Sequence, residues 1–153
     1  MTIANTLHVL FVVLWVGGMF FAHQCLRPVV AEQLEPPARL RLWVGVFRRF
    51  FPWVWIAATI ILLSGLWMIF ARFHGFSALP LYGHIMFGLG LVMIGVFLYV
   101  FFVPYQRLVA AVSSEEWPVG AKNLASIRQL VGINTILGVV TISTATGGRF
   151  LAF

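Results

Sequence analysis

The chain has 153 residues, of which 61% are hydrophobic and only 9% are charged, and its formal net charge is +6 at pH 7. A water-soluble domain of this length has too little interior to bury so much apolar surface, so the composition excludes a soluble globular protein and indicates an integral membrane protein. The basic residues stand in short segments between apolar runs, which favours topology signals and lipid phosphate contacts over nucleic-acid binding.

Four apolar runs are long enough to cross the hydrocarbon core as helices, which takes about 20 residues at about 1.5 Å each. They are expected at residues 6–26, 51–73, 79–103 and 130–146. Asparagine, serine and threonine dilute the fourth run, and because such side chains bond to helix carbonyls or to neighbouring helices, this helix is expected to pack inside a bundle. The sequence therefore predicts an all-α bundle of four transmembrane helices, formed by one domain over residues 1–153.

The segments between the runs also carry helical patterns. Residues 38–51 place arginines among leucine, tryptophan and phenylalanine, which is typical of an amphipathic helix at the inner membrane face. Pro52 is expected to open the second spanning helix, because the first helical turn tolerates a residue without an N–H group. After the third run, Pro118 and Gly120 are expected to break the chain before a helical pattern resumes at residues 121–129.

The distribution of basic residues predicts the orientation. The segments after the first and third runs together carry eight of them: Arg27, Arg39, Arg41, Arg48, Arg49, Arg107, Lys122 and Arg128. The other side carries only two, Arg72 and Arg149. Because lysine and arginine are enriched in cytoplasmic loops, both termini are predicted to lie on the outer, periplasmic side of a bacterial inner membrane.

The chemistry of the chain is expected to come from its four histidines. No phosphate loop, dinucleotide-binding glycine pattern, zinc-protease pair or Gly-x-Ser-x-Gly motif is present. The four glutamates all fall in predicted inner-side segments, which argues against a carboxylate proton relay through the membrane. An ionisable side chain inside a membrane helix costs free energy, so each intramembrane histidine is a functional hypothesis.

His8 and His84 each lie about one turn into a spanning helix from the predicted outer surface. Two imidazoles at matching depth on separate helices can bracket a metal ion or the iron of a haem. At 100° per residue, Gly88 and Gly95 lie within about 40° of His84 and would leave a groove without side chains. Trp15 lies similarly close to His8 and would supply an apolar wall. This pattern predicts a b-type haem between the first and third helices.

Three further residues belong to the predicted site. His74, in the short outer segment, is the rival ligand, and a solvated side chain explains it equally well. Arg72 and Arg149, the basic residues predicted on the outer side, would pair with the haem propionates, since a guanidinium matches a carboxylate geometrically. Contact with lipid headgroups explains these two arginines equally well.

Copper binding is the alternative, because imidazole ligates both copper and iron. In that hypothesis the same histidines bind the ion together with some methionines. Met19, Met68 and Met93 fall at membrane depth, although packing explains the methionines better than copper binding does. His23 has no histidine at matching depth on another helix and is expected to have no ligand role, and Cys25, the single cysteine, permits no internal disulfide. A third hypothesis is an accessory subunit of a larger membrane complex.

The first helix resembles the start of the CopD-like membrane proteins and of the related HemJ-type protoporphyrinogen oxidases. The matching residues are Leu7–His8, Phe11–Val12–Val13, Trp15, Gly18 and Phe20, with Tyr82–Gly83–His84 at the start of the third helix. The resemblance implies a four-helix membrane protein, associated with copper uptake or resistance in the CopD-like branch. In the HemJ-type branch it implies a b-type haem on His8.

The chain departs from the HemJ-type pattern at two places. Met86 stands where that pattern has a lysine, and Asn134–Thr135 stands where it has an Asn–Glu pair. Protoporphyrinogen oxidation is therefore not expected. The sequence instead predicts a haem b protein that acts in electron transfer or haem-dependent oxidation at the outer half of the membrane, with a redox partner or quinone, either alone or as a homo-oligomer. Copper transport or resistance is the alternative function.

Overall fold

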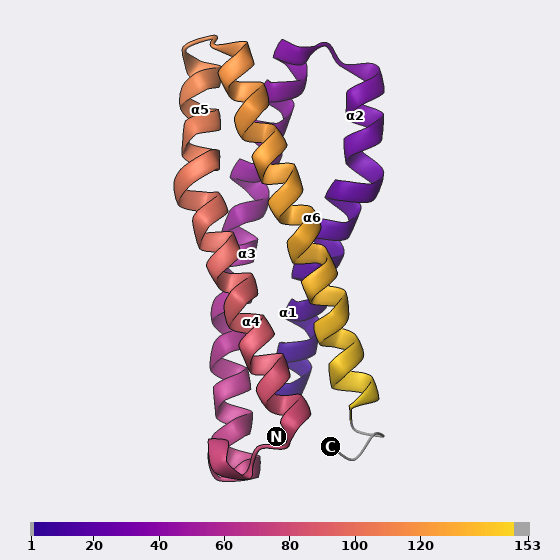
Figure 1. Ribbon diagram of the computed structural model, residues 1–153, viewed down its shortest axis with the longest axis vertical. Helices are drawn as coiled ribbons and strands as arrows, with labels where there is room; N and C mark the ends of the chain where they lie inside the picture. The colour runs from indigo at the N-terminus through magenta and orange to yellow at the C-terminus, as the bar shows by residue number, and fades with distance from the viewer. Residues whose placement is uncertain (1, 149–153) are drawn as a thin grey trace.

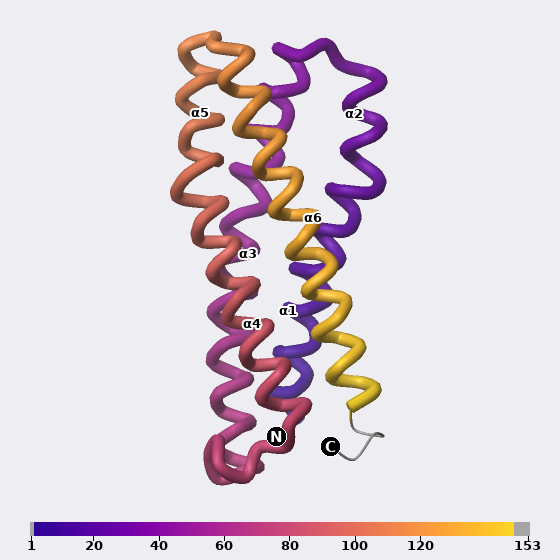
Figure 2. Tube along the Cα trace, in the orientation of Figure 1, coloured from indigo at the N-terminus to yellow at the C-terminus, as the bar shows by residue number. Residues whose placement is uncertain are grey.

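In the computed structural model, which describes residues 2–148, the chain forms four long helical rods that lie side by side (Figures 1 and 2). Each rod is long and apolar enough to cross a membrane, which confirms the predicted all-α architecture with four spanning helices. The first rod consists of α1 (Thr2–Phe20), a π-helical turn (Phe21–Leu26) and α2 (Arg27–Gln33), and the second rod is α3 (Pro36–Phe73). The third rod consists of α4 (Leu81–Val100), a second π-helical turn (Phe101–Tyr105) and α5 (Gln106–Ser113), and the fourth rod is α6 (Trp117–Gly147).

All four rods extend beyond the apolar runs that predicted them. Residues 38–51 are helical, but they form the first part of α3 instead of a separate helix at the membrane face. The expectation that Pro52 opens the second spanning helix is wrong, because Pro52 lies inside α3. The first turn of α3 holds Pro36 and Pro37 instead, where the missing N–H groups have no helical partner to lose. The expected break at Pro118 and Gly120 is also wrong, because both residues lie in α6, with Pro118 in its first turn.

Two π-helical turns interrupt the first and third rods, and a proline accompanies each. Arg27 N–H donates to the carbonyl of Ala22, five residues back, so this turn is wider than an α-helical one. Pro28 follows directly, and a proline ring clashes with the carbonyl four residues before it in a regular helix. The second turn contains Pro104 itself. We infer that the wider turns accommodate the prolines without breaking the rods.

The core of the bundle draws side chains from all four rods. α1 packs mainly against α3, and α4 packs mainly against α6. The buried residues include Trp15, Met19, Val54, Ala57, Met93, Phe97, Leu124 and Ile127. Many large apolar side chains remain exposed on the outside, among them Leu63, Trp67 and Phe70. Such an exterior suits contact with lipid, which is as apolar as the core.

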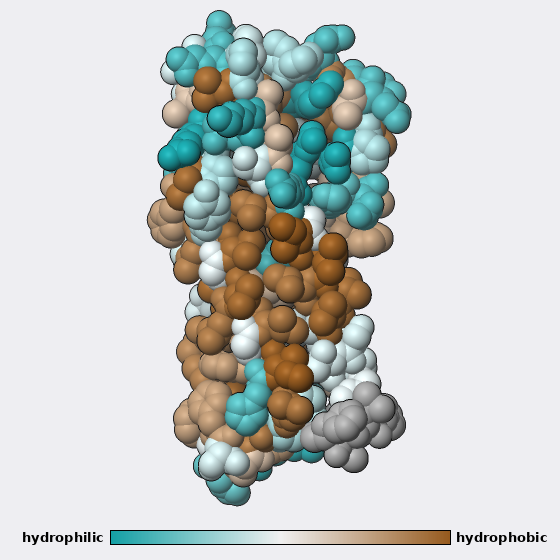
Figure 3. All heavy atoms as spheres, in the orientation of Figure 1, coloured by the Kyte–Doolittle hydropathy of each residue, from teal (hydrophilic) through white to brown (hydrophobic). Residues whose placement is uncertain are grey.

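The two ends of the bundle differ in polarity. The start of α1 and the end of α6 lie at one end, and the connection from α5 to α6 lies at the other (Figure 1). In Figure 3 hydrophilic side chains gather at the end where α2, α5 and the first part of α6 lie, while a hydrophobic band covers the middle. The hydrophilic end carries the basic residues that predict the inner side. Which end faces the cytoplasm stays a prediction.

Candidate functional site

His8 lies on α1 where this helix packs against α3. Its Nδ1 is 2.9 Å from Oγ of Ser64, a buried hydroxyl on α3. The Ser64 hydroxyl also donates to the carbonyl of Ile60, and a hydroxyl has only one proton to give. Ser64 therefore accepts from His8, whose proton resides on Nδ1. Nε2 of His8 then carries no proton, and its lone pair can bind a metal ion.

The same face of α1 continues from His8 into the centre of the bundle. Trp15 and Met19 follow His8 by seven and eleven residues, which places both within about 20° of it around the helix. Trp15 and Met19 are buried. Trp15 thus lies on the face of α1 that carries His8, as its spacing predicted.

Met19 contacts a buried asparagine on α6. Asn134 Nδ2 donates to Met19 Sδ at 3.7 Å and to the carbonyl oxygen of Met93 at 3.4 Å, so α1, α4 and α6 meet at one amide. Asn134 is only 3% exposed. Its Oδ1 is buried and has no hydrogen-bond partner among residues 2–148. The sequence signal for this junction was the single amide side chain, Asn134, inside the fourth apolar run. The site predicted from the histidines did not include it.

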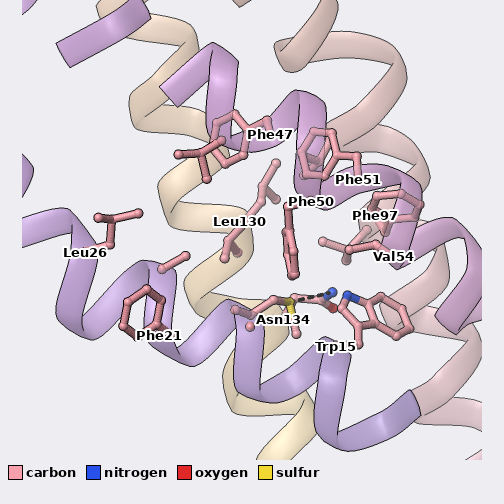
Figure 4. Close-up of a pocket in the computed structure, with 17 residues that line it drawn as sticks. Trp15, Phe21, Leu26, Phe47, Phe50, Phe51, Val54, Phe97, Leu130 and Asn134 are labelled. Carbon is pink, nitrogen blue, oxygen red and sulfur yellow. Dashed lines mark hydrogen bonds between the residues drawn. The ribbon is translucent and has the colours of Figure 1, made fainter. Parts of the chain in front are cut away.

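A cavity of about 180 Å³ lies beside this junction (Figure 4). Aromatic and aliphatic side chains of α1, α3, α4 and α6 surround it, including Phe47, Phe50, Phe51 and Phe97. In Figure 4 the amide of Asn134 and the nitrogen-bearing edge of Trp15 lie at the same end of the cavity. The lining of this cavity is therefore apolar except at this end.

His84 lies on the outside of the bundle. It is exposed, and its Nδ1 is 3.3 Å from the carbonyl oxygen of Pro80 in the same helical turn. Met93, which points into the core, follows His84 by nine residues and so lies about 180° around α4 from it. Gly88 and Gly95 share the His84 face and are exposed, and a Cβ added to either would meet nothing within 4 Å. The predicted groove therefore faces away from the core.

The described residues of the predicted haem site lie on different helices and differ in their surroundings. His8 is hydrogen-bonded to Ser64 on α3 and His84 is exposed on α4, so a haem ligated by both imidazoles stays a prediction. His74 is exposed and ends α3 in the left-handed conformation, with φ 56°. Arg72 is exposed, with its guanidinium carbon 5.7 Å from the ring centroid of Phe73. Arg149 lies outside the described residues.

His23 packs against α6. A Cβ added to Gly132 would lie 2.9 Å from Nε2 of His23, so the glycine makes room for the imidazole. The neighbouring Gln24 and Cys25 are exposed. Among residues 2–148, no three histidine, cysteine or carboxylate side chains gather as a group that could hold a metal ion.

Comparison with known proteins gives one match. The family model described as CopD, copper resistance protein D, matches residues 44–147. This segment runs from within α3 to the end of α6, so α1 with His8 and Met19 lies outside it. No curated protein matches the chain significantly. No solved structure does so either.

Proposed function

The chain belongs to the copper resistance protein D family, and from this membership we propose that it takes copper ions into its membrane-spanning bundle as cargo. The observation that carries the proposal is the position of His8 and Met19 on one packed face of α1. Both residues offer uncharged ligands, an imidazole nitrogen and a thioether sulfur. Thioether ligands select Cu(I), and imidazole also binds copper.

The two ligands stand at different depths. Met19 follows His8 by eleven residues, or about 16 Å along the helix axis. His8 offers Nε2 near the predicted outer end, because Ser64 occupies Nδ1. We propose that His8 receives the ion there and that Met19 holds it in the centre of the bundle.

The surroundings of Met19 favour a cation. The bond from Asn134 Nδ2 to the sulfur is long, at 3.7 Å, so it competes weakly with a metal ion. The unpaired Oδ1 of Asn134 carries partial negative charge beside it. Met93, buried on α4, adds a second thioether side chain to this region of the core. Cu(I) carries a single charge, and removing it from water costs less than removing Cu(II).

The basic segments indicate the membrane setting, and His8 leaves a second candidate function open. We place the protein in the inner membrane of a bacterium with both termini outside, on the strength of its basic segments. Haem b remains a second candidate that rests on His8 alone, whose Nε2 is free to ligate iron. A redox partner or quinone would accompany only that candidate, and a role as an accessory subunit of a larger membrane complex is a third, separate candidate.

A titration tests the copper proposal. The protein is purified in detergent and titrated with Cu(I) against a chromophoric Cu(I) chelator. We expect the protein to withdraw Cu(I) from the chelator with saturable stoichiometry. Competition no stronger than that of an unrelated four-helix membrane protein at the same concentration would refute the proposal. An absorption spectrum of the same sample, after supply of haem, tests the second candidate.

A further inference from the structure

Three arginines from three helices converge at the hydrophilic end of the bundle. Arg27 begins α2, Arg39 lies in the first turn of α3, and Arg128 lies in α6. Arg27 and Arg128 line the same small groove, and the positive charge of Arg39 acts on Arg128 together with that of Arg27. Within residues 2–148 none of the three forms a salt bridge, and the ion pair found there joins Arg41 to Glu115. The convergence therefore leaves positive charge without a compensating carboxylate.

The three guanidinium groups differ in their hydrogen bonds. Arg39 is held by its own chain, since its Nη2 donates to the carbonyls of Ala31 at 3.1 Å and Leu34 at 3.0 Å. Arg128 Nε is buried, and no acceptor for it lies within the described part of the chain. A buried charged donor without an acceptor is costly, so this site is short of an anion.

Two of the arginines line a small groove of about 20 Å³ between the first rod, α3 and α6. Its lining residues are Ala22, His23, Arg27, Trp43, Phe47, Ile127, Arg128 and Val131. Basic side chains therefore stand beside aromatic and aliphatic ones in a single groove. A ligand that matches both kinds of side chain has an anionic group next to hydrocarbon.

The depth of the site matches the headgroup level of a bilayer. Arg27 directly follows the first apolar run, and Arg128 stands two residues before the fourth. The two residues thus lie where hydrocarbon gives way to headgroups. Figure 3 shows hydrophilic side chains over the region between α2 and the adjoining part of α6, next to the hydrophobic band. Phospholipid phosphates lie at this level.

Local backbone features shape the groove. The π-helical turn Phe21–Leu26 ends immediately before Arg27, and such turns recur at functional sites because they redirect the side chains that follow. On α6, Gly132 leaves room for the ring of His23, so the π-helical turn and α6 approach closely. Both features bring Arg27 towards Arg128.

We propose that Arg27 and Arg128 bind the phosphodiester of an anionic phospholipid at the headgroup level of the bilayer. A guanidinium presents paired N–H groups that match phosphate oxygens, and basic pockets between membrane helices bind anionic headgroups. Arg39 adds a fixed positive charge. The surplus of positive charge selects an anionic lipid over a zwitterionic one. This inference does not depend on the copper proposal.

Thermal unfolding of the full chain tests the inference. The purified protein is melted in detergent with added phosphatidylglycerol, phosphatidylcholine or inorganic phosphate. We expect phosphatidylglycerol to raise the melting temperature more than phosphatidylcholine does. Arg128→Gln and Arg27→Gln should lose this difference, and Arg128→Lys should keep only part of it. Arg107→Gln is the matched control, because Arg107 is an exposed arginine on α5, outside the groove.

The outcomes distinguish the source of the phosphate. An equal difference between the two lipids in the wild type and in Arg128→Gln would overturn the proposal. An equal rise with inorganic phosphate alone would overturn the lipid assignment and indicate a site for free phosphate. If the glutamine variants do not fold, native mass spectrometry of Arg128→Lys replaces them, and retention of phosphatidylglycerol at the wild-type level would then contradict the proposal.

Discussion

His8 on α1 donates a hydrogen bond to Ser64 on α3, with 2.9 Å between Nδ1 and Oγ. The bond links two helices close to the end of the bundle that the charges predict to be outside. It also fixes the orientation of the imidazole ring and leaves Nε2 without a proton. A ligand group held in this way by a neighbouring helix is prepared for a metal ion before the ion arrives.

Ser64→Ala is expected to weaken Cu(I) binding without abolishing it. Loss of a group that orients a metal ligand lowers metal affinity by about 10–100-fold. His8→Ala should remove binding at this position altogether, and His84→Ala should have no effect because His84 is exposed on α4. Competition with a Cu(I) chelator measures all three. An unchanged affinity in His8→Ala would show that the ion binds elsewhere.

Met19→Leu separates copper binding from packing. The exchange nearly conserves volume, and swaps of this kind cost less than about 1.5 kcal/mol in a core. The variant should therefore fold, while its Cu(I) affinity falls because the sulfur is gone. Met86→Leu, on α4, is the control. Chelator competition at wild-type strength in Met19→Leu would remove this methionine from the proposed site.

Gly138→Ala is expected to destabilise the bundle. A Cβ there would lie 2.7 Å from Cγ2 of Val16, a buried side chain that is branched at Cβ and cannot easily rotate away. Overpacking of this kind costs about 1–3 kcal/mol. Gly88→Ala should be neutral, because a Cβ at Gly88 meets nothing within 4 Å. Melting temperatures in detergent compare the two variants, and equal values would contradict the packing shown.

Reporter fusions test the orientation. A reporter after Phe153 should behave as periplasmic, and one in residues 111–120 should behave as cytoplasmic, because eight of the ten basic residues lie at the latter end. The start of α1 and the end of α6 share one end of the bundle, so a fusion before α1 should agree with the fusion after Phe153. Disagreement between these two terminal fusions would mean that one helix does not cross the membrane.

An absorption spectrum tests the haem hypothesis. Because His84 faces away from the core, we expect no low-spin bis-histidine spectrum after haem is supplied. A sharp Soret band with resolved α and β bands, lost in both His8→Ala and His84→Ala, would instead establish the pair as axial ligands. Loss of the bands in His74→Ala instead would assign the second ligand to the end of α3.

Much of the fold was predictable from the sequence by itself. Hydropathy located the four spanning helices, because the bilayer requires long apolar segments whose backbone groups bond internally. Four crossings place the start of α1 and the end of α6 at the same end of the bundle. His8 and Trp15 could be assigned to one face of their helix from spacing alone. These features depend only on local sequence and on the membrane.

Only the tertiary structure decided which face of each helix points inward. His84, Gly88 and Gly95 share a face as their spacing predicted, yet that face is exposed while Met93 is buried. Lipid and protein core are equally apolar, so the hydrophobic pattern of α4 carries no information about its rotation around its own axis. Packing against α6 determines that rotation. The same packing brings Asn134 to Met19 and Arg128 towards Arg27, which no spacing along one helix could have predicted.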